Sequence, residues 1–302
     1  MKIALILNSA SGTAMDDAAR DKMRQRFADA GCEVREHALG QGKDMESLVR
    51  AALADRPDAV VVGGGDGTLS SAAGFLMGSK IPMGVLPLGT FNHFAKDLGI
   101  PLEIEGAVDA ILGAHRTAVD VGDVNGRTFI NNSSLGIYPR IVRRRDALRS
   151  RLRIAGGKLW AFAWATVTAL RRTPFLDADV CLDGKTRNIR TPFLFIGNNA
   201  YNMEGFGAGK RERLDGGHLS AYFTRRGGRL QLVVLGLRAL FGMLAEAKDF
   251  EAVEAQTLEV HSRHARLLVA LDGEIESMDT PLAYRIHRAA LQVLVPEPAP
   301  AK

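Results

Sequence analysis

Four glycines, an aspartate and a threonine stand together at 63–68, directly after an apolar run at Ala59–Val62. Glycine lets main-chain N–H groups approach a phosphate closely because it has no side chain. Phosphate repels the carboxylate of Asp66, so we expect that carboxylate to face a metal ion or a metal-bound water. No Gly-Lys-Ser/Thr follows, and the spacing is not that of a dinucleotide fingerprint. The segment therefore predicts a phosphate site of another kind; the alternative is a plain glycine turn between a strand and a helix.

Two further polar loops follow apolar runs in the first hundred residues. One is Asn8–Gly12, after the run that begins at Lys2, and the other is Pro87–Ala95, after Met83–Leu86. In a parallel sheet the carboxyl ends of the strands open into one crevice, where ligands bind. Three such loops are hard to explain as unrelated turns, so we expect them to form one ligand site.

The elements that would position these loops alternate between strand and helix patterns. The expected strands are Lys2–Asn8, Glu33–Ala38, Ala59–Val62 and Met83–Leu86, and the expected helices are Thr13–Ala30, Lys43–Ala54 and one that begins at Leu69. This alternation is typical of a doubly wound, Rossmann-like parallel sheet with helices on both faces.

The pattern changes near residue 117. Asn125-Gly126 and Asp183-Gly184 are tight-hairpin signals. The later expected strands are Thr117–Val124, Arg127–Asn132, Thr191–Ile196, Leu219–Phe223, Thr257–His261, Leu267–Leu271, Ala283–Ile286 and Leu291–Val295, with helices at about 156–171 and 230–247. We therefore predict an α/β domain over 1–120 and an antiparallel β-sandwich domain over 121–295, and leave open whether the last strand returns to the first domain.

Composition excludes several classes of protein. With 46% hydrophobic and 24% charged residues among 302, the chain is neither disordered nor fibrous. Two cysteines cannot form a disulfide scaffold or a four-cysteine zinc site, which favours a reducing cytoplasm. We expect no secretory signal and no membrane span, because the apolar runs are too short.

The net charge of +5 is unevenly distributed. Residues 1–120 carry 12 basic and 16 acidic side chains, whereas 140–172 carry ten basic residues and one acid. This excludes a uniformly basic surface for nucleic acid. The basic segment holds Arg143, Arg144 and Arg145 and both tryptophans, Trp160 and Trp164. Arginines beside tryptophans suit docking on anionic lipid; the alternative is a core helix flanked by solvated arginines.

The motifs together resemble one family. Gly64–Thr68 with Pro87–Asn92 is similar to the catalytic domain of the bacterial diacylglycerol kinase family, to which sphingosine and ceramide kinases are related. Motifs that resemble the family's continue to the end of the chain: Asp120-Val121-Gly122, Phe129–Asn132, Leu214–Gly216 and Leu271–Glu274. NAD kinases and phosphofructokinases share only the first motif.

The resemblance implies Mg-ATP as the phosphoryl donor and a lipid acceptor at a membrane surface. It assigns Glu274 as the base that takes the acceptor's proton and places Asp66 in the catalytic site, with Asp120 in a supporting acidic network. Implied metal ligands are Glu212, Asp215 and Gly217, the first and last through main-chain carbonyls. The implied ATP-binding residues are Asn8, Ser9, Ala10, Ser11, Gly12, Gly64, Gly65, Asp66, Gly67, Thr68, Leu69, Ser70, Gly89, Thr90 and Asn92.

The resemblance also implies a cytoplasmic protein that contacts the inner face of the membrane through 140–172, with no nucleic-acid partner and with precedent for a homodimer. Three positions depart from the family pattern: Ser9 replaces a proline, Ser70 replaces an asparagine, and His93 replaces an aspartate. The sequence leaves two alternatives open. One is a kinase of another hydroxyl, such as phosphatidylglycerol, a sphingoid base or an NAD-like cofactor. The other is a nucleotide-binding regulatory protein that has lost turnover.

Overall fold

The computed structural model describes residues 1–8, 15, 17–38, 44–136, 139, 175–202, 210–224 and 250–297. The chain divides into two compact units. The first comprises Met1–Asn131, Lys210–Gly217 and Ile286–Lys302, and the second comprises Asn132–Gly209 and His218–Arg285.

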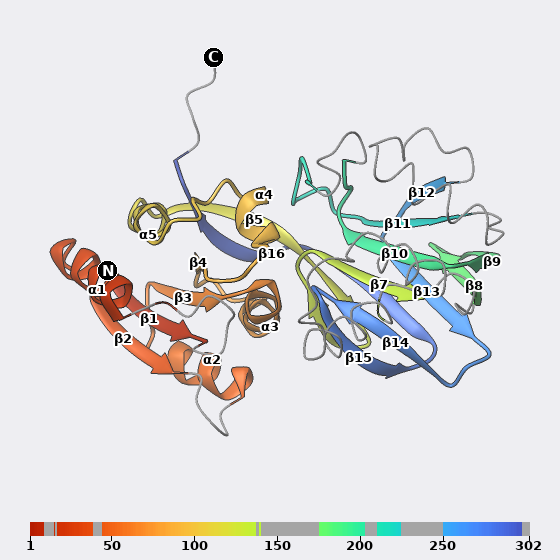
Figure 1. The fold of residues 1–302 in the computed structure, drawn as a ribbon, viewed down its shortest axis with the longest axis horizontal. Coiled ribbons are helices and arrows are strands. Elements are labelled where there is room, and N and C mark those ends of the chain that lie inside the picture. The colour runs from red at the N-terminus through yellow and green to blue at the C-terminus, as the bar shows by residue number, and fades with distance from the viewer. Residues whose placement is uncertain are drawn as a thin grey trace, which may run out of the picture. The chain divides into compact units, whose positions relative to one another are not determined.

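The first unit is an α/β domain built on a mainly parallel sheet (Figure 1). Its elements are β1 (Lys2–Leu7), α1 (Asp17–Asp29), β2 (Glu33–Ala38), α2 (Met45–Ala54), β3 (Ala59–Gly64), α3 (Asp66–Leu76), β4 (Met83–Pro87), α4 (His93–Asp97), α5 (Ile104–Leu112), β5 (His115–Val124), β6 (Arg127–Phe129) and the end of β16 (Leu282–Val295). The strand order is β2-β1-β3-β4-β16, and β5 pairs with β16 and β6.

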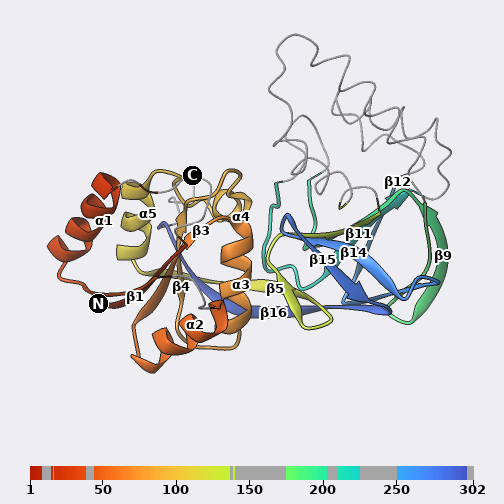
Figure 2. The same cartoon turned by 60° about the horizontal axis from the view of Figure 1, so that its bottom comes forward.

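Helices cover both faces of this sheet. Helices α1 and α5 lie together on one face, and α2 and α3 lie together on the other (Figure 1, Figure 2). Such a sheet needs strands that are apolar on both sides, and every residue of β3 is indeed buried. In β3 the polar side chains therefore begin only after the strand, at the junction with α3.

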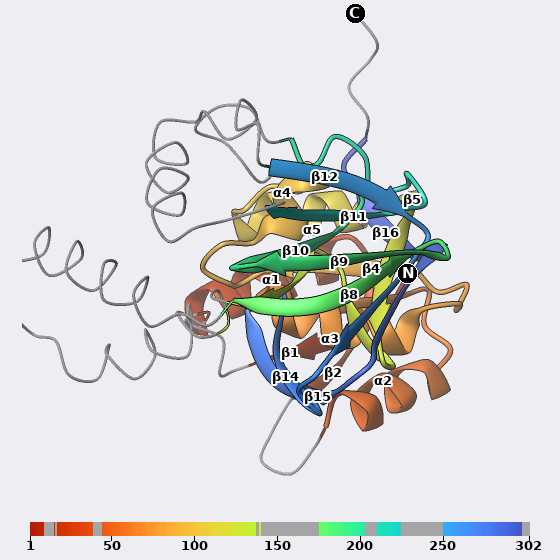
Figure 3. The same ribbon diagram turned by 90° about the vertical axis from the view of Figure 1, so that its right-hand side faces the viewer.

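The second unit contains two antiparallel sheets, parts of which face the viewer in Figure 3. Its strands are β7 (Asn132–Gly136), β8 (Leu176–Leu182), β9 (Lys185–Thr191), β10 (Phe193–Asn198), β11 (Leu219–Thr224), β12 (Phe250–Ala255), β13 (Thr257–Ser262), β14 (Arg266–Leu271), β15 (Glu274–Asp279) and the beginning of β16. One sheet has the order β12-β11-β10-β7-β14-β15, and the other continues from β16 through β13 and β8 to β9. The predicted fold class, an α/β domain followed by an antiparallel β domain, is confirmed.

Both predicted tight hairpins are present. Asn125 and Gly126 have φ values of 48° and 82° between paired Val124 and Arg127. Asp183 and Gly184, at 43° and 82°, join β8 to β9 in the same way. Two consecutive left-handed residues match the right-handed twist of the strands that they connect, which is why Asn-Gly and Asp-Gly predict such turns well.

Several expected boundaries were wrong. Helix α3 begins at Asp66 rather than Leu69, so the aspartate and the threonine of the glycine segment lie in the first helical turn. The run Thr191–Ile196 is divided between β9 and β10 at Pro192, which has no N–H to donate to a ladder. The expected strands Ala283–Ile286 and Leu291–Val295 are one strand, β16.

The expected strand Arg127–Asn132 is also divided. Its first part is β6, which pairs with β5 in the first unit, and its last residue begins β7 in the second. The change of unit therefore falls between Asn131 and Asn132, whereas the sequence placed it after residue 120. Strand β16 passes from the second unit back into the first at Ile286. Within the described ranges, no helix combines the length and apolar character needed to cross a bilayer.

Candidate functional site

The glycine segment forms the junction between β3 and α3. Gly65 precedes the helix in an extended conformation, with φ −84° and ψ 176°, and no described side chain caps it. The first main-chain N–H groups of a helix have no partner within the helix, and the helix dipole makes this end attractive to anions. The junction therefore offers main-chain donors of the kind that a phosphate site needs, and the phosphate site itself stays a prediction.

Gly89 brings the next loop against this junction. A Cβ atom on Gly89 would lie 2.5 Å from the Cα atom of Gly65, closer than carbon atoms can pack. The Leu88 N–H donates to the Gly64 carbonyl at 3.0 Å. Gly64 is equally restricted, because its Cβ would lie 2.6 Å from the Thr68 side chain. Two of the three expected loops are thus in main-chain contact.

The Asn92 side chain forms hydrogen bonds within its own loop, Pro87–Asn92. Its φ of 51° is left-handed, and its side chain is buried. Its Oδ1 accepts from the Gly89 N–H at 2.9 Å, and its Nδ2 donates to the carbonyls of Gly89 and Pro87 at 2.9 and 3.2 Å. The neighbouring Thr90 is exposed. We therefore assign Asn92 to positioning Gly89.

Asn8 ties the first loop to the same junction. Its Nδ2 donates to the Thr68 Oγ1 at 2.9 Å, and its N–H donates to the Gly63 carbonyl at 3.0 Å. The four remaining residues of that loop, Ser9, Ala10, Ser11 and Gly12, lie outside the described residues.

Leu69 and Ser70, two expected ATP-binding residues, have buried side chains. The Ser70 hydroxyl donates to the Thr128 carbonyl at 3.1 Å, and the Thr128 hydroxyl donates back to the Ser70 carbonyl at 3.3 Å. These two hydrogen bonds join α3 to β6 through Ser70.

Asp66 accepts hydrogen bonds from two different parts of the first unit. Its Oδ2 accepts from the His93 N–H at 3.2 Å, and its Oδ1 accepts from the Phe94 N–H and from Nδ2 of Asn131, each at 3.1 Å. The contact with His93 uses the main chain, so it does not depend on which side chain stands there. The His93 ring instead stacks on exposed Phe91 at 5.7 Å between ring centroids.

A buried arginine that no sequence motif indicates contacts Asn131. Arg211 forms an ion pair with Asp97, and these side chains are 0% and 4% exposed. It also donates to Oδ1 of Asn131 at 2.6 Å. No sequence signal could have found it, because Lys210-Arg211-Glu212-Arg213 has the composition of an exposed charged segment.

Asp120 is a buried connection within the first unit. Its Oδ2 accepts from the Gly217 N–H at 2.6 Å, its Oδ1 accepts from the Ala289 N–H at 2.7 Å, and its own N–H donates to the Leu214 carbonyl. The carboxylate thus joins β5, β16 and the segment 210–217. Both oxygens are occupied by main-chain donors, which makes Asp120 a structural brace in this arrangement.

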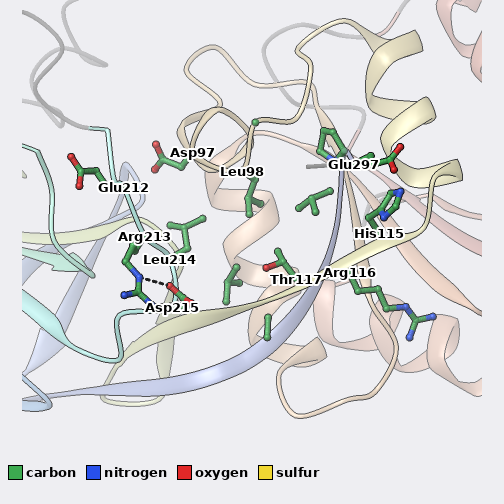
Figure 4. Close-up of a pocket in the computed structure, with 15 residues that line it drawn as sticks. Asp97, Leu98, His115, Arg116, Thr117, Glu212, Arg213, Leu214, Asp215 and Glu297 are labelled. Atoms are coloured by element: carbon green, nitrogen blue, oxygen red, sulfur yellow. Dashed lines mark hydrogen bonds and ion pairs between the residues drawn. The ribbon is translucent and has the colours of Figure 1, made fainter. Parts of the chain in front are cut away.

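The three expected metal ligands lie on the segment 210–217. Asp215 is paired with Arg213, with Nε 3.0 Å from Oδ1, and this guanidinium lowers the pKa of the Asp215 carboxyl (Figure 4). Glu212 is exposed, and Gly217 has a left-handed φ of 74°. Glu212 and Asp215 line a cleft of about 640 Å³ that His115 and Glu297 also line (Figure 4).

The described residues contain no group of three His, Cys, Asp or Glu side chains that could hold a metal ion. Mg²⁺ commonly uses only one or two carboxylates and completes its shell with water and substrate phosphates. One carboxylate beside the candidate phosphate junction, as at Asp66, is compatible with an ion that arrives with a nucleotide. The Asp66 carboxylate alone is not a metal site of three side-chain ligands that could hold an ion without a nucleotide.

Glu274 lies in the second unit, as the first residue of β15. It follows a two-residue turn in which Asp272 and Gly273 have φ values of 46° and 91°. Asp272 holds this turn to β7, since its Oδ1 accepts from the Asn132 N–H at 2.9 Å and its N–H donates to the Asn132 carbonyl. The turn connects β14 to β15, which pair as an antiparallel hairpin. The Glu274 side chain is exposed, and therefore open to a substrate.

The expected membrane-facing residues Arg143, Arg144, Arg145, Trp160 and Trp164, with the whole of 140–172, lie outside the described residues. The same holds for the helix expected at 230–247.

Fold and loops together define a protein with a parallel α/β domain, glycine loops at its strand ends and a second, antiparallel β domain. Residues 2–124 match the family model described as the diacylglycerol kinase catalytic domain, which confirms the expected resemblance over that segment.

Named relatives agree with this match. The diacylglycerol kinase of Bacillus subtilis is 34% identical over 130 residues, which are 42% of this chain and 43% of that protein. The "Probable lipid kinase YegS-like" protein of Pseudomonas syringae pv. tomato is 34% identical over 152 residues, 50% of this chain and 47% of that protein. The chain thus spans less than half the length of these curated relatives.

A solved structure shares the fold over nearly the whole chain. The crystal structure of a diacylglycerol kinase from Bacillus anthracis matches with a TM-score of 0.70 at 20% identity, over 97% of this chain and 96% of that one.

Proposed function

We propose that this chain is an ATP-dependent lipid kinase that transfers the γ-phosphate to a lipid hydroxyl, with diacylglycerol as the acceptor and phosphatidic acid as the product. One observation carries most of the proposal. The backbone of Gly89 rests on that of Gly65 beside the start of α3, whose first main-chain N–H groups are suited to phosphate. The names of the relatives supply the class of acceptor.

In the proposed reaction the acceptor oxygen attacks the γ-phosphorus, and the bond from that phosphorus to the bridging oxygen breaks to release ADP. Main-chain N–H groups of the junction at 64–68 hold the phosphates. The exposed Glu274 carboxylate takes the proton from the attacking hydroxyl. Asp66, held by the start of α4 and by Asn131, presents its carboxylate beside the phosphates. Magnesium bound with the nucleotide would neutralise phosphate charge.

The proposed setting is the inner face of the cytoplasmic membrane. The basic, tryptophan-containing segment 140–172 is the proposed contact with anionic lipid. Binding to vesicles should rise with anionic lipid content and fall with salt. Unchanged binding after Arg143, Arg144 and Arg145 are all replaced by Glu would contradict this part of the proposal. A homodimer is proposed only from the precedent of the family.

The acceptor is tested with ATP labelled in its γ-phosphate and a panel of lipids in mixed micelles. Label in phosphatidic acid supports the proposal. Label in phosphatidylglycerol, a sphingoid base or an NAD-like cofactor would instead identify a kinase of another hydroxyl. ATP binding without transfer to any acceptor would identify the regulatory alternative.

A further inference from the structure

Asn131 is the only side chain among the described residues that donates to Asp66. It is 2% exposed, so bulk water cannot substitute for its protein partners. An asparagine amide has nearly the same shape when its oxygen and nitrogen exchange places, and only one orientation can donate to a carboxylate. With the other orientation, the amide oxygen would face the Asp66 carboxylate and repel it. Some other group must therefore select the orientation.

Arg211 is placed to make that selection. A guanidinium has donors and no acceptor, so it can satisfy the oxygen of Asn131 but not its NH₂ group. Its Nη2 lies 2.6 Å from Oδ1 of Asn131, and its Nη1 lies 2.6 Å from the Ile130 carbonyl. The same side chain thus fixes the main chain at 130 and the amide at 131. Nδ2 of Asn131 is then directed to Asp66.

Asp97 holds the guanidinium in turn. Its Oδ2 accepts from Nε of Arg211 at 2.8 Å, with both side chains almost wholly buried. Burying an ion pair costs desolvation, and a pair of apolar residues would often be as stable, so stability alone explains this pair poorly. Asp97 is also the last residue of α4, whose first two N–H groups donate to Asp66.

We propose that Arg211 is a positioning residue for the phosphoryl-transfer site, which acts through the amide of Asn131 to keep Asp66 in its donor-surrounded orientation. The role of Asp66 in transfer rests on the proposed function, whereas the orientation of Asn131 by Arg211 does not. An experiment can therefore refute the role of Asp66 in transfer without refuting the orientation of Asn131 by Arg211, and the reverse.

The experiment compares the wild type with Arg211→Met, Asn131→Ala and the double variant. Arg211→Lys keeps the charge opposite Asp97 but cannot reach all three acceptors at once, and it serves if the methionine variant does not fold. Arg26→Met is the matched control, because it removes another arginine–aspartate pair, with Asp109, that is exposed and lies on α1 and α5.

The direct readout is the NMR signal of the Asn131 side-chain amide, assigned by its loss in Asn131→Ala. We expect two resolved and slowly exchanging protons in the wild type, and rapid exchange in both Arg211 variants but not in Arg26→Met. Unchanged amide signals in the Arg211 variants would overturn the proposal, whether or not the protein is a kinase.

The kinetic readout is a double-mutant cycle on kcat. Arg211→Met should lower kcat by up to about 100-fold, because small displacements in a transfer site have effects of that size. In the Asn131→Ala background the same change should have little further effect. Additive losses would show that Arg211 acts elsewhere and would overturn the proposal. Absence of lipid phosphorylation by the wild type would refute the proposed function, and the amide signals would still decide the role of Arg211.

Discussion

The contact between Gly65 and Gly89 makes the substitution Gly89→Ala a severe test of the candidate phosphate site. The new Cβ would lie 2.5 Å from the Gly65 Cα and 2.7 Å from Oδ1 of Asn92. Carbon atoms in contact prefer roughly 3.5–4.0 Å, so the two loops must separate by about 1 Å or more. Overpacking of this kind destabilises a protein by about 1–3 kcal/mol.

The effect on nucleotide binding should exceed the effect on folding. Separating the loops displaces the donors that are proposed to hold the phosphates, and a 1 Å displacement can cost on the order of 100-fold in a reaction that depends on orientation. We therefore expect Gly89→Ala to remain folded at moderate temperature but to bind Mg-ATP at least about tenfold more weakly, with a smaller kcat.

Gly113→Ala is the matched control for this substitution. Gly113 ends α5 with a helical φ of −63°, and its new Cβ would make only ordinary contacts of 3.4 Å or more. It should leave ATP affinity unchanged and raise the free energy of unfolding by at most about 1 kcal/mol. The assays are urea unfolding and equilibrium binding of a nucleotide analogue. Equal ATP affinity in the two alanine variants would refute the assignment of the loops at 65 and 89 as the phosphate site.

Three further substitutions test other parts of the structure. The hydrogen bond from Arg24 lowers the pKa of Glu36 from its ordinary 4.5, so Glu36 stabilises the fold above pH 4.5 and loses this effect as the pH falls through its folded-state value. Glu36→Gln should thus lower the free energy of unfolding by about 1 kcal/mol at neutral pH. The difference in unfolding free energy from the wild type should vanish in acid, and a difference that is the same at all pH values would contradict this role of Glu36. Asp120→Asn replaces one of two buried acceptors by an NH₂ group that opposes an N–H, such as that of Gly217, and should cost about 1–3 kcal/mol in urea unfolding; an unchanged midpoint would contradict the bracing role. Asn92→Ala should weaken Mg-ATP binding because the loop loses its internal hydrogen bonds; wild-type affinity would show that the loop holds its shape without them.

Local signals explain what the sequence could predict. The strand expected at Ala59–Val62 and the tight turn expected at Asn125-Gly126 are each determined by residues adjacent in the chain. Both are present in the structure. The start of α3 was placed three residues late because glycine is a poor helix former, whereas Gly65 here serves as the extended residue before the helix. Strand β15 was missed because its burial does not alternate regularly between the two faces.

Long-range features of the site could not be predicted. The contact between Gly65 and Gly89 and the hydrogen bond from Asn131 to Asp66 join segments far apart in the chain. Arg211 is the clearest case, since arginine is seldom fully buried and its neighbours are charged. The change of sheet after Asn131 likewise depends on pairing between β7, β10 and β14, which no local pattern shows.

The proposed activity is transfer of phosphate from ATP to a lipid hydroxyl, with Glu274 as the proton acceptor. The most direct measurement is transfer of label from ATP to diacylglycerol by the wild type and by Glu274→Gln, with ATP affinity measured in parallel. We expect labelled phosphatidic acid from the wild type, a rate roughly 10²- to 10⁴-fold lower for Glu274→Gln, and equal ATP affinity in both. Full-rate transfer by Glu274→Gln would contradict the assigned base, and the absence of labelled lipid from a wild type that binds ATP would contradict the kinase itself.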